Sequence, residues 1–208
     1  MTHRPLHVEV WFDLICPWCW IGKRQLEQAM AQHRQLHPRR PLRVQWRSQQ
    51  LLPNVPPQGL PYVEFYLDRL GSAAALAARQ AQVCEAGASV GLTFNLSGIP
   101  LMPNTRAAHA LIADAQAQCD AATVDALIEQ LFQAHFMRGM NLDDGELLGA
   151  LAECHDIEDG SAEPCLEPVA TGVPLFEVNE TLALSGSQSP QRLLALLLKA
   201  GECADQAA

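Results

Sequence analysis

The pattern of apolar and polar residues gives the chain a strand–helix–strand beginning. Residues 7–14 (HVEVWFDL) mix alternation with β-branched and aromatic side chains, which predicts a strand. Helical spacing follows to about residue 36, and Pro38 and Pro41 end that helix before a second predicted strand over residues 42–47. Two strands joined by one helix of this length predict a βαβ unit with a parallel strand pair.

The middle of the chain has a helical pattern. Residues 59–155 are rich in Ala and Leu at helical spacing, and only residues 91–103 read as a loop. Polar residues that can cap helix N-termini precede most of the apolar periods. We therefore expect helices over residues 61–70, 72–88, 104–118, 120–138 and 143–155, with caps at Ser72, Asn104 or Thr105, Asp120, and Asp143 or Asp144.

The end of the chain returns to a mixed pattern. Residues 174–179 predict a short strand, and residues 181–184 a second one after a tight turn. Ser-Pro at residues 189–190 then predicts the start of a helix over residues 191–200, with a frayed tail beyond it. The fold class is thus α/β, with residues 1–55 and 156–208 forming one discontinuous domain and residues 56–155 forming an inserted helical domain.

Composition narrows the classes of partner. The 208 residues are 49% hydrophobic and 18% charged, which is enough apolar material for a substantial core. The net charge is −9 and no basic run reverses it locally, so nucleic acid is an unfavourable partner. No apolar run approaches the roughly 18 residues that span a bilayer, and the N-terminus lacks the layout of a secretory signal. We expect no membrane partner and a cytoplasmic location.

Cys16 and Cys19 carry the clearest chemical signal. They frame Cys-Pro-Trp-Cys at the start of the first helix, where a spacing of three residues puts both sulfur atoms on one face. Cys16 occupies the cap position, at which the helix dipole and unpaired N–H groups stabilise a thiolate. Cys19 lies deeper in the first turn, where it can resolve a mixed disulfide. Pro17 stiffens this turn, and Trp18 offers an aromatic surface to a substrate.

A zinc site is the main alternative for such a pair. A structural zinc site needs four ligands, usually from a second cysteine pair at short spacing, and the sequence has no other CxxC. We therefore expect no metal. The chain has seven cysteines; we interpret Cys84, Cys119 and Cys154 as small buried hydrophobes, and expect Cys165 and Cys203 to be more exposed. We likewise interpret His109 and His135 as hydrogen-bonded or surface histidines, with an influence on Cys16 as the alternative.

A Gly-Val-Pro segment at residues 172–174 precedes the first strand of the C-terminal part. Together with CxxC on the first helix of a βαβ unit, it resembles the thioredoxin superfamily. The resemblance implies a cis Val173–Pro174 bond facing the redox pair, with the main chain of Val173 holding an extended substrate. Without that context, Pro174 would simply begin an edge strand.

Several further segments narrow the resemblance. VWFDLICPWCWIGK, PNTRAAH, LFQAHF, GVPLFEVN and SGSQ occur in this order, and the set is similar to the FrnE subgroup of DsbA-like proteins. That subgroup carries a helical domain inserted in a thioredoxin fold and is mostly cytoplasmic. Related isomerases of 2-hydroxychromene-2-carboxylate and kappa-class glutathione transferases typically have Ser in place of the first Cys. This chain departs from the subgroup in residues 156–171, where a helix is shortened or lost.

Three functions follow as hypotheses. The first is a thiol–disulfide oxidoreductase without a bound cofactor, acting on a disulfide- or thiol-containing protein or small molecule through Cys16 and Cys19. The second is a glutathione-dependent isomerase or transferase of a small hydrophobic or aromatic substrate. Glutathione is a candidate co-substrate in either case. The third is a non-catalytic binding module, and the sequence permits a monomer or a homodimer.

Overall fold

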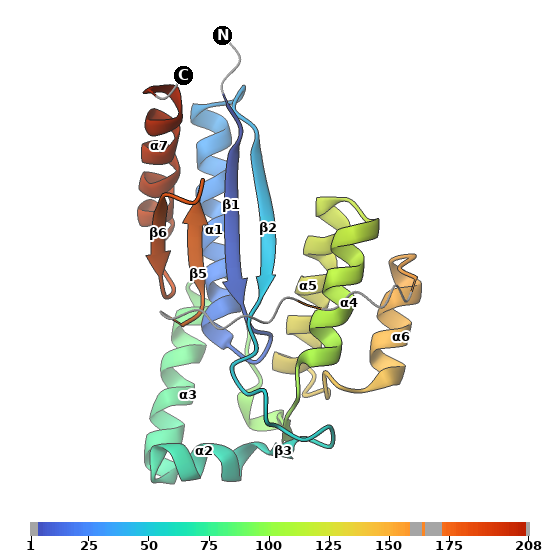
Figure 1. The fold of residues 1–208 in the computed structure, drawn as a ribbon. Coiled ribbons are helices and arrows are strands. Elements are labelled where there is room, and N and C mark those ends of the chain that lie inside the picture. The colour runs from blue at the N-terminus through green and yellow to red at the C-terminus, as the bar shows by residue number, and fades with distance from the viewer. Residues whose placement is uncertain (1–3, 159–163, 165–171, 207–208) are drawn as a thin grey trace. The chain divides into compact units, whose positions relative to one another are not determined.

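The computed structural model describes residues 4–158, residue 164 and residues 172–206 (Figure 1). The chain divides into two compact units, one from Met1–Gln49 and Leu166–Ala208 and the other from Gln50–Cys165. Residues 50–55 and 156–158 therefore belong to the helical unit, although the sequence pattern assigns them to the other domain. The segment over which we expect a shortened helix, residues 156–171, lies largely outside the described residues.

The first unit is built on a four-stranded sheet in the order β2-β1-β5-β6. β1 and β2 run parallel with Val10 opposite Trp46, as the βαβ prediction requires. β5 pairs antiparallel with β1, and β6 pairs antiparallel with β5. The four strands are β1 (Leu6–Phe12), β2 (Leu42–Ser48), β5 (Leu175–Val178) and β6 (Leu182–Ser185). Each lies within a residue or two of its predicted range.

Side chains on one face of this sheet form the core of the first unit. Leu6, Val8, Val10 and Phe12 alternate along β1 and are almost completely buried, and Phe176 of β5 pairs with Val10 on the same face. Burial of each large apolar side chain contributes about 1.5–3 kcal/mol. Helices α1 (Pro17–Leu36) and α7 (Pro190–Gln206) pack on each other, and in Figure 1 α1 runs behind β1 and β5.

Helix α7 is longer than the sequence predicts. We expected it to end near residue 200 with a frayed tail, but it continues to Gln206. The buried guanidinium of Arg40 explains the extension, because it donates to the carbonyl of Gly201 at 3.2 Å and pairs with Asp205 at 2.5 Å. The frayed-tail prediction is therefore wrong for residues 201–206.

The second unit consists mainly of helices, and its caps confirm most of the predicted starts. Ser72 accepts from the N–H of Ala75, Asp120 from that of Thr123, and Asp144 from that of Glu146. These bonds satisfy N–H groups that a helix start leaves without an intrahelical partner. The helices are α2 (Tyr62–Leu70), α3 (Ala73–Ala88), α4 (Arg106–Gln118), α5 (Ala121–Phe136) and α6 (Gly145–Cys154).

Two short elements in this unit escaped the sequence pattern. β3 (Leu60–Pro61) pairs antiparallel with β4 (Leu101–Met102), and a 3-10 turn covers Leu96–Gly98. Two-residue strands are too short to show alternation, so they read as a helix start and a loop. Within the part of the chain that the structure describes, no helix is long and apolar enough to cross a membrane.

Candidate active site

The cysteine pair lies where β1 gives way to α1. A tight turn links the two elements, because the N–H of Cys16 donates to the carbonyl of Asp13 at 3.1 Å. Cys16 is the extended residue that precedes the helix, Pro17 is the first helical residue, and the N–H of Cys19 donates to the carbonyl of Cys16 at 3.0 Å. The sequence therefore places Cys16 correctly at the helix N-terminus, where the helix dipole favours a negative charge.

The two thiols differ in their surroundings. Cys16 is 7% exposed and Cys19 only 2%, and both are free thiols in this structure. Burial raises the pKa of the Cys19 thiol well above its ordinary value, and the neighbouring Cys16 and the charge of Asp13 raise it further, against an opposing main-chain contact of Asp13. Cys19 is consequently a neutral thiol at physiological pH.

The Val173–Pro174 segment meets Cys16 from the other end of the chain. The Val173–Pro174 peptide bond is cis, the isomer that the resemblance implies. The Cys16 thiol lies 3.9 Å from the carbonyl oxygen of Val173, within the range of a weak S–H···O hydrogen bond. Pro174 is buried, and its carbonyl accepts from the N–H of Gly186 at 2.7 Å. The structure thus brings together Cys16 and Val173, which are 157 residues apart.

Pro17 and Trp18, the two residues between the cysteines, are half-buried. Pro17 takes the first helical position, where its missing N–H removes no intrahelical hydrogen bond. Trp18 is partly exposed, and its contact with a substrate stays a prediction.

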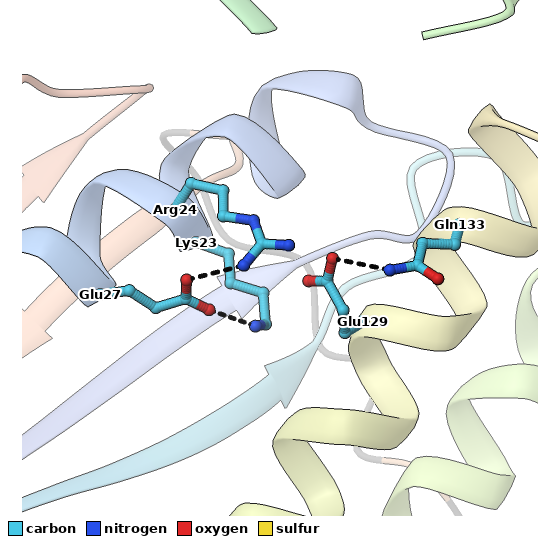
Figure 2. A network of polar contacts seen from close by, with 5 residues as sticks. All are labelled: Lys23, Arg24, Glu27, Glu129 and Gln133. Carbon is cyan, nitrogen blue, oxygen red and sulfur yellow. Dashed lines mark hydrogen bonds and ion pairs between the residues drawn. The ribbon is translucent and has the colours of Figure 1, made fainter. Parts of the chain in front are cut away.

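A charged cluster follows the pair on α1 (Figure 2). The Lys23 side chain is only 2% exposed, and its ammonium pairs with the carboxylate of Glu27, which also binds Arg24 at 3.0 Å. Figure 2 also shows a separate hydrogen bond within α5, where Gln133 donates to Glu129 at 3.2 Å. A buried ammonium is costly unless it is paired, and Glu27 supplies that pairing within the helix itself.

Asp13 is the residue at this site that our sequence reasoning missed. Its side chain is fully buried directly after β1, and its charge acts on Cys19. The sequence does hold a sign of its role, because Asp13 lies between Phe12 and Leu14 in an otherwise apolar segment. An acidic residue is rarely buried without a specific partner.

The remaining candidate residues divide into core and surface. His109 and His135 are completely buried in the helical unit, so neither is a surface residue. Cys84 and Cys119 are half-buried, so the predicted burial is met only in part, and Cys203 is exposed, as predicted. Cys154 is exposed as well, so its predicted burial is wrong: it ends α6, a helix in which Leu151 is the buried residue. Cys165 lies outside the described residues.

The described residues contain no preformed metal site. No group of three or more His, Cys, Asp or Glu side chains within residues 4–158, 164 and 172–206 is arranged to hold an ion. The cysteine pair would have to recruit ligands from elsewhere to bind zinc.

The family model of the DSBA-like thioredoxin domain matches residues 7–170 of the chain. Among solved structures, a probable DsbA oxidoreductase from Streptomyces coelicolor is similar with a TM-score of 0.79 and 24% identity, over 94% of this chain and 89% of that one. The cytosolic disulfide reductase DsbM from Pseudomonas aeruginosa, solved with GSH, gives 0.57 and 16%, over 93% and 98%.

A third similar structure is a 2-hydroxychromene-2-carboxylate isomerase, with a TM-score of 0.56 and 14% identity over 97% of both chains. At these identities the likenesses show a shared fold. No curated protein matches the chain.

Proposed function

The chain belongs to the family of DSBA-like thioredoxin domains, and from this premise we propose that it is a thiol–disulfide oxidoreductase with Cys16 and Cys19 as its redox pair. The observation that carries the proposal is the placement of Cys16 at the start of α1, with its sulfur 3.9 Å from the carbonyl of Val173. A nucleophilic sulfur and a main-chain group that can hold an extended substrate then lie side by side.

The difference between the two thiols supports a two-step exchange. Cys16 as thiolate attacks a substrate disulfide, forming a mixed disulfide and releasing one substrate sulfur as a thiolate. Cys19, kept protonated by burial, then loses its proton and attacks the Cys16 sulfur. The second substrate sulfur leaves, and the protein is left with a Cys16–Cys19 disulfide. The same steps in reverse oxidise a dithiol.

Substrate contacts are part of the proposal. We assign the main chain of Val173 to holding the substrate, Pro174 to shaping the surface beside Cys16, and Pro17 and Trp18 to contacting the substrate from the helix side. A thiol such as glutathione is the proposed co-substrate that returns the pair to its reduced form, without a bound cofactor. We further propose the FrnE subgroup and a cytoplasmic location, which the order of the sequence motifs supports.

A trapping experiment tests this function. In Cys19→Ala the resolving sulfur is absent, so a disulfide substrate should accumulate as a mixed disulfide on Cys16, detected as a mass increase that dithiothreitol removes. Cys16→Ser should form no adduct at this position, and Cys203→Ala, which removes an exposed cysteine remote in sequence from the pair, should turn over like the unmodified protein. If Cys19→Ala turns over a disulfide substrate at the unmodified rate, Cys19 is not the resolving residue and the proposal fails.

A further inference from the structure

Helix α1 has a glycine, Gly22, where the side chains of Phe176 and Pro174 come close. Gly22 is buried, and a Cβ atom added there would lie 3.0 Å from Cζ of Phe176 and 3.2 Å from Cγ of Pro174. Both distances are shorter than ordinary carbon–carbon contacts, which begin near 3.5 Å. A side chain at this position would therefore require Phe176 or Pro174 to shift by a few tenths of an ångström.

A second contact joins the same helix face to the same part of the site. Gln25 lies three residues after Gly22, so the two residues share one face of α1. The Ser187 hydroxyl donates to the side-chain oxygen of Gln25 at 2.7 Å. The residue before Ser187, Gly186, donates its N–H to the carbonyl of Pro174. The segment around Pro174 is thus held to α1 directly at Gly22 and through Ser187 at Gln25.

The same helix carries Cys16 at its N-terminus. Whatever fixes the Pro174 segment on α1 therefore also fixes the 3.9 Å separation between the Cys16 sulfur and the Val173 carbonyl. We propose that Gly22 and Gln25 are positioning residues that hold the Val173 main chain beside Cys16, and thereby favour extended peptide disulfides over small ones. This inference rests on the proposed function of the cysteine pair.

The reason for a selective effect is that the two kinds of substrate use different contacts. A small disulfide needs only an accessible Cys16 sulfur, whereas an extended peptide also needs main-chain partners at a fixed place. Phe176 is fully buried, which leaves its ring little room to move away from a new Cβ. A new Cβ would then also press on the Pro174 ring, and a shift of Pro174 would displace the Val173 main chain bonded to it.

Gly22→Ala tests this role, with dithiothreitol-driven reduction of hydroxyethyl disulfide and of a ten-residue peptide carrying one mixed disulfide. We expect kcat/KM for the peptide to fall about three- to tenfold, because displacements of a fraction of an ångström at a reacting centre reduce rates on this scale. The rate with hydroxyethyl disulfide and the rate of Cys16 alkylation should not change. Gly149→Ala is the matched control, because it is also a helical glycine and an added Cβ there has no atom within 4 Å. It should change neither rate.

Gln25→Ala provides a second variant in case Gly22→Ala does not fold, as judged by its circular dichroism. It removes the hydrogen bond from Ser187. Like Gly22→Ala, it should lower kcat/KM for the peptide and leave the rate with hydroxyethyl disulfide unchanged. Two results would overturn the positioning role while the unmodified protein remains active. One is an equal loss of rate with both substrates, and the other is no loss of rate with the peptide in folded Gly22→Ala and Gln25→Ala. If the unmodified protein reduces neither substrate, the proposed function fails and the positioning role fails with it.

Discussion

Alkaline pH should destabilise the reduced protein through the buried thiol of Cys19. Its side chain is 2% exposed, and burial, Cys16 and Asp13 together raise its pKa well above the ordinary value of 9.0. A group whose pKa is raised in the folded state contributes its full stability below the unfolded pKa. That stability is lost as pH rises from about 9 towards the folded value, because only the unfolded chain can release the proton.

The size of this loss follows from the linkage relation. One proton that the folded state retains and the unfolded state releases changes the free energy of unfolding by about 1.4 kcal/mol per pH unit. With an unfolded value of 9.0, the Cys19 contribution between pH 8 and pH 10 is therefore roughly 1 to 2 kcal/mol. Burial also raises the pKa of Tyr62, but that contribution is common to the variants compared below.

Urea denaturation at pH 8, 9 and 10, with a phosphine reductant present, measures the effect. Cys19→Ala removes the titrating group, so its free energy of unfolding should fall less steeply with pH than that of the unmodified protein. Cys203→Ala removes an exposed cysteine and should retain the steeper dependence. If the unmodified protein and Cys19→Ala lose stability in parallel between pH 8 and pH 10, Cys19 is not held as a buried thiol, and the assignment of the resolving residue loses its physical basis.

Two further predictions concern Asp13 and the helical unit. Asp13→Asn removes one of the charges that raise the pKa of Cys19, so that pKa should fall but stay above its ordinary value because burial remains. An NMR titration of the Cys19 Cβ in a Cys16→Ser background measures this pKa. An unchanged pKa would refute the influence of Asp13. Ser72→Ala removes the oxygen that accepts from the N–H of Ala75 at 3.1 Å, and it should lower the free energy of unfolding in urea by about 1 kcal/mol. Ser72→Asp keeps an accepting oxygen and should retain the stability. Equal stability of the two variants would show that the cap contributes nothing.

The sequence predicts most elements because local signals and tertiary packing agree there. Alternation over residues 7–14 identifies β1, and Asn179 and Glu180 mark the turn between β5 and β6, where both residues adopt positive φ angles. The end of α7 was not predictable in this way. The helix continues past residue 200 because Arg40, more than 160 residues earlier, donates to Gly201, and such a distant partner leaves no periodic signal in the sequence.

The candidate site likewise has some residues that the sequence identifies and others whose role depends on packing. Cys16, Cys19 and the Gly-Val-Pro segment carry motifs that can be recognised along the chain. The contributions of Asp13 and Gly22 depend on what surrounds them. A carboxylate perturbs a thiol only once it is buried near Cys19, and a side chain in place of Gly22 meets resistance only because Phe176 and Pro174 approach it. Those conditions arise from packing between segments that are far apart in the sequence.

The measurement that tests the central claim most directly is a redox titration of the purified protein in glutathione buffers, with the Cys16–Cys19 state read by mass spectrometry after alkylation. The proposed function predicts one reversible two-electron transition between a dithiol and an intramolecular disulfide, which is absent in Cys16→Ser. If no Cys16–Cys19 disulfide forms at any ratio of reduced to oxidised glutathione, or if a stable glutathione adduct accumulates on Cys16 instead, the oxidoreductase assignment is contradicted. A glutathione-dependent isomerase or transferase would then be the better description of this protein.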